Sequence, residues 1–161
     1  MADLKNILAQ LKFQQLSTYL QSGNVVFDSK STNRLELEKC ISEAILASFG
    51  FDIKVKVIAK DQFQQAFLKN PFVKNSGIDT KQLYYIHLMG HPDITVFKQL
   101  QADESIPEQM DLIGDVIYVN YVNGYGRSKL HGGIFEKKLK VSATARNHNT
   151  MKHLSQMLDA L

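Results

Sequence analysis

The sequence predicts an α+β fold, a tandem duplication of a β-α-β-β-α-β unit with an added helix, in which the first unit lacks its first strand. Three observations predict it. Apolar residues recur at strand or helix spacing in a matching order in the two halves. A glycine turn marks a hairpin in each half. The hairpin glycines, Gly23 and Gly114, are 91 positions apart, and the helices that close the two halves begin at a similar separation.

The first half opens with a helix, because Leu4, Ile7, Leu8 and Leu11 follow the spacing of one helical face. Its later elements are predicted from β-prone runs, cap residues and helix breakers. They are a hairpin of 16–20 and 25–27, a helix from a cap within 31–33 to Gly50, a strand at 53–57 and a helix at 61–69.

The same order restarts after an irregular segment at 72–80. The expected elements are a strand at 83–89, a helix at 93–100, a hairpin of 110–113 and 116–121, a helix at 128–139, an extended stretch at 141–145 and a last helix capped by Asn149 or Thr150. We therefore expect two ferredoxin-like halves, residues 1–72, truncated at the amino terminus, and residues 80–161, which carry a basic carboxy-terminal segment.

The missing strand has a physical consequence. The first strand of a ferredoxin-like unit lies inside its sheet, so without it the neighbouring strands keep unpaired backbone groups. We expect this gap to be filled by self-association through the unpaired edge or by a segment upstream of Met1.

The composition is typical of a globular protein, with 44% hydrophobic and 22% charged residues. No stretch approaches the roughly 18 apolar residues that span a bilayer, and no secretory leader precedes the first helix. We expect a soluble, cytoplasmic protein without a membrane partner. Cys40 falls on the apolar helical face, so we expect it to be buried. Neither Cys40 nor the five histidines show metal-ligand spacing, so no metal or cofactor is expected.

Charge is concentrated near the carboxyl end. The whole chain has a formal charge of +3, but residues 125–152 hold seven Lys or Arg against one Glu. Such a segment attracts anions, although a solvated lysine-rich helix face is an equal alternative. Two motifs within it are candidate ligand-binding sites. Their residues are Gly124, Tyr125, Gly126, Arg127, Ser128 and Lys129 in the first, and Arg146, Asn147 and His148 in the second.

The first motif joins a strand to a helix, where free backbone N–H groups can hold an anion and Arg127 and Lys129 can supply charge. The alternative is a plain glycine turn with Ser128 as the helix N-cap. In the second motif, Arg146 can bind an anion and His148 can titrate near neutrality, while Asn149 and Thr150 are better explained as caps. Both motifs lie where the chain enters a helix, so they are candidates for one shared site.

Four segments carry a resemblance to a known family: 18–27 (TYLQSGNVVF), 123–130 (NGYGRSKL), 135–139 (FEKKL) and 143–150 (ATARNHNT). Together they resemble the bacterial domain-of-unknown-function family 1697 over essentially the whole chain. The resemblance implies a duplicated ferredoxin-like fold and implies no activity, because the family has no established function. It also implies an apolar strand and a glycine loop before the residue that matches Met1.

Three hypotheses about function remain open. The first is a binding module for a phosphorylated or carboxylate ligand, a small anion held by Arg127, Lys129 and Arg146. The second is an enzyme acting on a phosphorylated metabolite, with His148 as acid and base, although no nucleophile is identified. The third is RNA or DNA binding through the same patch, for which the adjacent strand aromatics Tyr84 and Tyr85 give weak support.

Overall fold

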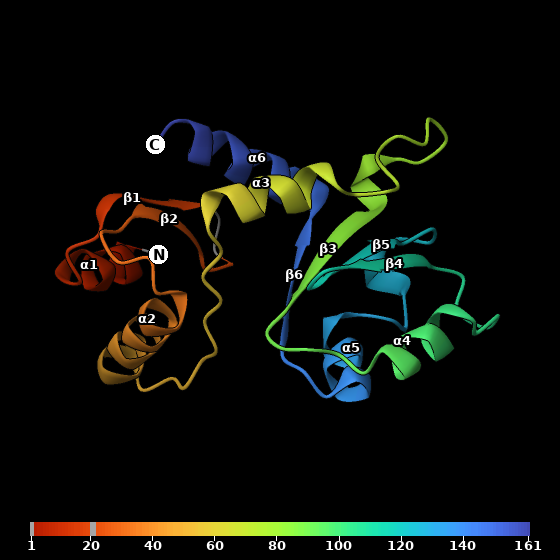
Figure 1. Ribbon diagram of the computed structural model, residues 1–161, viewed down its shortest axis with the longest axis horizontal. Coiled ribbons are helices and arrows are strands. Elements are labelled where there is room, and N and C mark those ends of the chain that lie inside the picture. Colours follow the sequence, from red (N-terminus) through yellow and green to blue (C-terminus); the bar gives the residue numbers. More distant parts are fainter. Residues whose placement is uncertain (1, 20–21) are drawn as a thin grey trace. The chain divides into compact units, whose positions relative to one another are not determined.

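The computed structural model describes residues 2–19 and 22–161. They form an α+β protein with two antiparallel sheets and six α-helices. The chain divides into two compact units, one made of residues 1–64 and 154–161 and the other of residues 65–153 (Figure 1). The expected division into 1–72 and 80–161 stays a prediction.

The first unit contains a helix, a hairpin and a long helix, followed by an extended segment. Its elements are α1 (Ala2–Gln10), β1 (Gln14–Tyr19), β2 (Asn24–Asp28) and α2 (Arg34–Phe49), together with the start of α3 (Lys60–Leu68). The two strands form a two-stranded antiparallel sheet, with Thr18 opposite Val25 and Ser17 opposite Val26. Leu20, expected as the last residue of the first strand, lies outside the described residues.

The ends of these elements follow the expected local chemistry. The Asn33 side chain accepts a hydrogen bond from the Glu36 N–H and caps α2. Gly50 ends that helix with φ 73°, a conformation that costs glycine little. A small core then forms where α1 and α2 pack on the hairpin. Its buried members are Leu8, Ile41 and Ile45.

Two sequence predictions fail in the first unit. Residues 53–57 do not form a strand, although Val55 and Val57 pack against the core as alternation predicts. Side chains of α2 take the place of a ladder partner here: the Ser42 hydroxyl donates to the Ile53 carbonyl at 2.8 Å, and the Val57 N–H donates to a Glu38 carboxylate oxygen at 2.8 Å.

Cys40 is the second failure, because it is exposed instead of buried. The buried stripe of α2 consists of Leu37, Ile41 and Ile45, which recur every fourth residue. Cys40 precedes Ile41 by one residue and therefore lies about 100° away around the helix. The stripe is narrower than the apolar sequence pattern implied.

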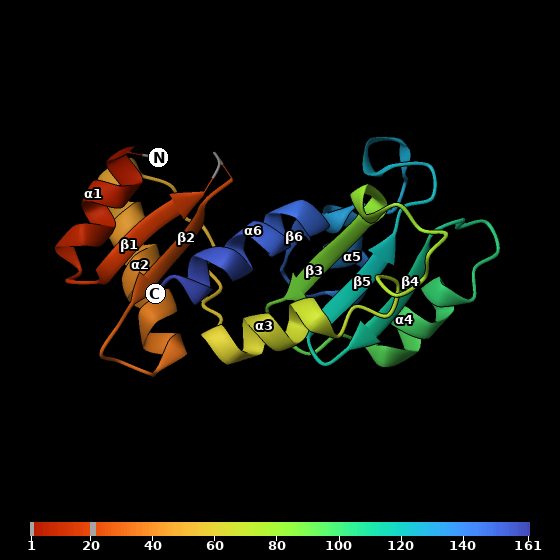
Figure 2. The same ribbon diagram turned by 90° about the horizontal axis from the view of Figure 1, so that it is seen from above.

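The second unit contains a four-stranded sheet in the order β4-β5-β3-β6, antiparallel throughout (Figure 2). Its elements are β3 (Leu83–Leu88), α4 (Ile94–Gln101), β4 (Gln109–Ile113), β5 (Val116–Asn120), α5 (Gly132–Leu139) and β6 (Ala143–Asn147), and α6 (His148–Asp159) follows. The order along the chain is thus β-α-β-β-α-β with an added helix. β3 lies inside the sheet, between β5 and β6.

One face of this sheet packs against α4 and α5. Alternate residues of β3 and β5, among them Ile86 and Ile117, meet Phe97 of α4 and Phe135 of α5 in the main core. All four side chains are buried. This face carries the larger of the two cores described here.

The opposite face of the same sheet is also covered. The Tyr118 hydroxyl donates to the Ala66 carbonyl at 2.9 Å, and the Phe67 ring lies 6.2 Å from that of Tyr85. Tyr85 and Tyr118 are fully buried and contact each other edge to face at 5.5 Å. β3 is therefore enclosed by side chains on both faces and by strands on both edges.

The α+β class is confirmed, whereas a ferredoxin-like duplication is not. The second unit has the complete strand order of such a unit. The described part of the first unit has the corresponding helices and hairpin, but its sheet contains only β1 and β2. The likeness between the halves is therefore one of element order along the chain.

Candidate functional site

The first candidate motif lies in the connection between β5 and α5. Gly124 has φ 82° and ψ 145°, which is accessible to glycine and strained for other residues. A single 3-10 turn follows at Tyr125–Arg127, in which the Arg127 N–H donates to the Gly124 carbonyl at 3.2 Å. The α-helix begins only at Gly132, four residues later than predicted.

Ser128 does not cap that helix. Its hydroxyl accepts a hydrogen bond from the Leu130 N–H at 2.9 Å, which closes a local turn and buries Leu130. His131 occupies the N-cap position of α5 without a side-chain hydrogen bond. Ser128 therefore stabilises a turn and not a helix start. Serine is favoured at both positions, so the sequence alone did not distinguish them.

Aromatic packing fixes the loop to the sheet. Tyr125 stacks on Tyr84 of β3 with ring centroids 4.5 Å apart and planes 9° apart. Tyr121 meets both rings edge to face at 5.1 Å. Tyr121 is fully buried, and burial raises the pKa of its hydroxyl strongly, so this hydroxyl stays protonated. The three tyrosines define a rigid aromatic anchor beneath the loop.

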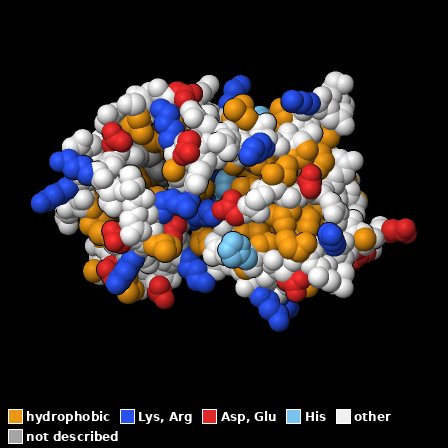
Figure 3. All heavy atoms as spheres, in the orientation of Figure 1, with side chains coloured by type: hydrophobic (Ala, Val, Ile, Leu, Met, Phe, Trp, Pro, Cys, Tyr) orange, Lys and Arg blue, Asp and Glu red, His pale blue; other side chains and the backbone are white. Residues whose placement is uncertain are grey.

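The loop also carries two cations, Arg127 and Lys129. Arg127 and Lys129 are exposed, and within the described part of the chain neither makes an ion pair or a side-chain hydrogen bond. A Cβ built at Gly126 would meet no atom within 4 Å, so the backbone between the anchor and the cations is open to approach. On the face drawn in Figure 3, Lys and Arg side chains occur at several separate places among acidic, polar and apolar ones.

Arg146 lies on β6 and is held by its own strand. One guanidinium nitrogen donates to the Thr144 hydroxyl at 2.6 Å and to the Ala145 carbonyl at 2.8 Å. The side chain is half-buried opposite Tyr85, and burial lowers the pKa of the guanidinium. Part of the hydrogen-bonding capacity of the Arg146 guanidinium is therefore already satisfied within the protein.

Asn147 performs the capping that the sequence had suggested for Asn149 or Thr150. Its side-chain oxygen accepts a hydrogen bond from the Thr150 N–H at 2.8 Å, and α6 begins at His148. Asn147 also faces Tyr84 in register and hydrogen-bonds its hydroxyl, which partly offsets the rise in the pKa of Tyr84 caused by burial.

His148 is buried against the other face of the sheet. Its Nδ1 lies 2.9 Å from the Tyr85 hydroxyl, and its ring lies 5.3 Å from that of Phe67. Burial is the main cause that lowers the pKa of His148, and the nearby Lys152 charge adds to it. The imidazole is therefore neutral at pH 7.

The structure thus separates the predicted residues into two groups. Tyr125 and Asn147 come together at Tyr84, on the side of the sheet that carries α4 and α5. Arg146 and His148 lie around Tyr85 on the opposite side, because neighbouring strand residues alternate in direction. The sequence pattern placed all of them at helix starts and could not tell the two sides apart.

Some residues that shape these groups were missed. Tyr121 was not predicted as a site residue, because a single tyrosine at the end of an apolar strand is not part of a recognisable motif. Asn70, which is buried beside Tyr85, was interpreted only as part of a helix stop before Pro71. Alternation along β3 was the signal that could have revealed these two groups, since it places the side chains of Tyr84 and Tyr85 on opposite faces of the sheet.

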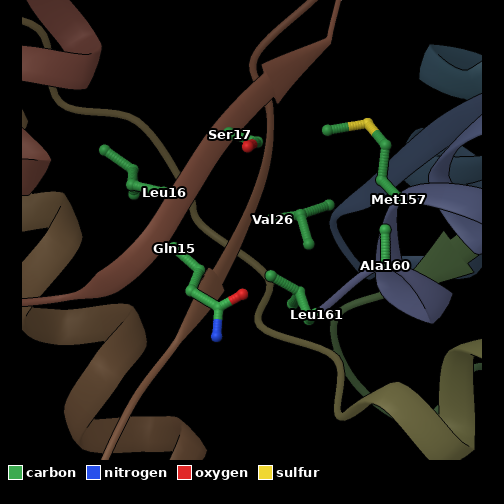
Figure 4. A pocket seen from close by; sticks show the side chains of 7 residues that line it. All are labelled: Gln15, Leu16, Ser17, Val26, Met157, Ala160 and Leu161. Atoms are coloured by element: carbon green, nitrogen blue, oxygen red, sulfur yellow. The ribbon is translucent and has the colours of Figure 1, made fainter.

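The described residues show no cluster of His, Cys, Asp or Glu suited to a metal ion. A hollow of about 450 Å³ occurs within the first unit, and no residue of the two candidate motifs lines it. It is lined by Gln15, Leu16, Ser17, Val26, Met157, Ala160 and Leu161 (Figure 4). In the part of the chain that the structure covers, no helix has both the length and the apolar character needed to cross a bilayer.

Comparisons with known proteins identify the fold without a function. A conserved bacterial protein from Streptococcus pneumoniae has a similar solved structure, with a TM-score of 0.69 and 19% sequence identity, over 98% of this chain and 88% of that one. The curated proteins give no match. The model of a family described as a protein of unknown function, DUF1697, matches residues 1–118. The chain therefore belongs to domain-of-unknown-function family 1697.

Proposed function

We propose that the loop at 124–129 binds a small phosphate-bearing or carboxylate ligand, with Arg127 and Lys129 as its two cations. The observation that carries this proposal is that both side chains are exposed and lack internal partners in the described structure, on a loop that the tyrosine anchor holds in place. Cations that the protein does not use for its own fold are available to an anion.

Arg146 belongs less readily to this site. Its guanidinium already donates to Thr144 and Ala145 and is half-buried on the side of the sheet that carries Tyr85. We therefore assign Arg146 a structural role. Replacing it should lower stability more than it lowers anion affinity, because a half-buried, hydrogen-bonded group is lost.

The enzyme hypothesis is not favoured by the geometry. An acid-base histidine must reach its substrate, but His148 is buried and its Nδ1 faces the Tyr85 hydroxyl. Nucleic-acid binding is not favoured either. Tyr85 is enclosed and Tyr84 stacks on Tyr125, so neither ring offers an open face of the sheet to a base.

The test is a thermal-shift screen with nucleotides, sugar phosphates and short RNAs as probes, because a ligand that binds only the folded state raises the melting temperature. We expect some small anions to raise it, and we expect Arg127→Ala and Lys129→Ala each to reduce that rise. Lys98→Ala is the matched control, since it removes an exposed charge from α4 of the same unit.

Two outcomes would contradict the proposal. An equal rise in the parent and in both loop variants would place the anion elsewhere. A response to RNA alone that falls steeply with added salt would favour nucleic-acid binding instead.

A further inference from the structure

A buried carboxylate lies at the end of the sheet that carries the loop. Glu108 comes directly before β4 and is only 8% exposed, yet its carboxylate makes no ion pair and no hydrogen bond among the described residues. A carboxylate withdrawn from water is costly unless a cation or a hydrogen-bond donor meets it. Its oxygens are not among the polar atoms that the protein encloses completely. Glu108 is therefore a candidate acceptor for a group from outside the protein.

Strand register places Glu108 beside Tyr121. Gln109 is opposite Asn120 in the ladder of β4 and β5, so Glu108 and Tyr121 occupy the next pair of positions. Met110, two residues after Glu108, and Tyr121 both belong to the core beneath α4 and α5. Alternation along the strand therefore directs Glu108 to that same face. The Glu108 carboxylate lies on the side of the sheet that carries the tyrosine anchor.

The Tyr121 hydroxyl is a second polar group without a partner. It is closed off from solvent and forms no hydrogen bond in the described structure. Burial, followed by the neighbouring Tyr125, Glu108 and Tyr84, raises the pKa of this hydroxyl, so the polar ends of these side chains lie near one another. Buried hydroxyls in native proteins are nearly always hydrogen-bonded. An unpartnered hydroxyl beside an unpaired carboxylate therefore indicates a missing donor.

The binding loop connects this polar cluster to the two exposed cations. Tyr125 packs edge to face on Tyr121 with ring centroids 5.1 Å apart, and Arg127 and Lys129 follow it closely along the chain. The connection thus has positive charge on its outer part and the acceptors Glu108 and Tyr121 at its base. Charges of both signs in one site favour a ligand that carries both.

From these observations we infer that the anion bound by Arg127 and Lys129 also carries a primary ammonium group, which donates to the Glu108 carboxylate and to the Tyr121 hydroxyl. The inference rests on the proposed function and names its ligand class, a small zwitterion such as an amino-sugar phosphate or a phosphorylated amine. An ammonium group has three N–H donors and a positive charge, so it satisfies both acceptors. A hydroxyl in its place has one donor and leaves the charge of Glu108 unpaired.

The test is isothermal titration calorimetry of the intact chain with two pairs of probes that differ only at the amino group. The pairs are glucosamine 6-phosphate with glucose 6-phosphate and phosphoethanolamine with ethyl phosphate, which separate the charged groups by different lengths. We expect the amino member of at least one pair to bind about tenfold or more tightly than its counterpart.

Variants then assign this preference to the two acceptors. Glu108→Gln should reduce the ratio of the two affinities to within about twofold, and Tyr121→Phe should reduce the ratio by about threefold. Glu104→Gln is the matched control, because it removes an exposed carboxylate from the same connection between α4 and β4, and it should leave the ratio unchanged. Without probe, neither acceptor variant should melt at a lower temperature than the parent, because each loses a group that has no partner.

Three outcomes would overturn the inference. They are equal affinities within both pairs, a preference that survives Glu108→Gln, and a lower melting temperature of both acceptor variants, which would show that these groups already have partners within the protein. The anion-binding proposal is judged separately. If all four probes bind equally and Arg127→Ala weakens all of them, the loop binds anions without an ammonium site. If none binds at concentrations up to about 10 mM, the inference fails, and the response to other anions decides the proposed function.

Discussion

The two units share an order of elements but differ in how much of the strand surface is enclosed. In the second unit, β3 has strands on both edges and buried residues on both faces. In the first unit, β1 and β2 form a sheet alone, and most of their residues are half-buried or exposed. The difference teaches that the inner strand does more than add its own contacts, because it also encloses the strands beside it.

The largest expected effect comes from truncating a buried side chain of β3, the enclosed strand. Ile86→Ala removes a fully buried side chain from the main core and should lower the free energy of unfolding by about 2 to 5 kcal/mol. Val25→Ala in β2 is the matched change in the first unit and should cost less, because Val25 is only half-buried. Urea unfolding of both variants measures the two values, and an equal loss would remove the contrast between the units.

A smaller effect is expected from the buried hydroxyl of the same strand. Tyr85→Phe leaves the Nδ1 of His148 without its partner and should cost about 1 to 3 kcal/mol in the free energy of unfolding. Tyr125→Phe is the control, because that hydroxyl has no hydrogen bond in the described structure and its residue is only half-buried. Chemical denaturation of the three proteins compares them. Equal stability of Tyr85→Phe and the parent would show that this hydrogen bond contributes nothing.

The same contact predicts a pH dependence. Burial lowers the pKa of His148 in the folded protein, so the unfolded chain binds a proton more readily. The resulting stability is complete above the ordinary histidine pKa of about 6.5 and is lost as the pH falls from there toward the lower folded value. His148→Gln should flatten this part of the stability curve. An unchanged slope between about pH 6.5 and pH 5 would contradict the assignment.

The start of α6 gives a still smaller effect. Asn147→Ala removes the cap of the Thr150 N–H and should cost about 1 kcal/mol, measured as a shift of the urea midpoint. Asn149→Ala tests the cap that the sequence had suggested, and it should change stability by less than about 0.5 kcal/mol because Asn149 is exposed. The reverse order of the two effects would restore the earlier assignment.

Cys40 gives a test without any stability change. It is exposed on α2, so the native protein should react with a thiol reagent at nearly the rate of the unfolded chain. The comparison is made with and without denaturant. Strong protection in the native state would show that the buried face of α2 includes Cys40 after all.

Local signals in the sequence were enough for most of the fold. Asn33, Gly50 and the turn glycines ended or began elements where their chemistry required it, and periodicity located all six helices. The prediction of a strand at 53–57 was wrong. Alternation indicates which side chains face the core, whereas a strand also needs a hydrogen-bonded neighbouring strand, which local sequence does not specify. Val55 and Val57 are half-buried and pack against the core as predicted, yet no ladder forms in the described structure.

The candidate site was harder to predict for a similar reason. Ser128 and Asn147 each lie near a helix start, but only Asn147 caps one, because turns and caps select the same polar residues. Whether Arg146 and Arg127 share a side of the sheet depends on the strand register. That register is set by long-range pairing with β3 and is not visible in either motif.

The placement of the tyrosines gives this protein a built-in optical reporter. The chain has no tryptophan and six tyrosines, five of which lie in the second unit, three of them packed around the loop anchor. Near-ultraviolet absorbance and fluorescence therefore record the state of the second unit almost alone, with Tyr19 as the single chromophore of this kind in the first. Loosening of the first unit should therefore change the near-ultraviolet signal only through Tyr19, whereas amide exchange reports it throughout the unit.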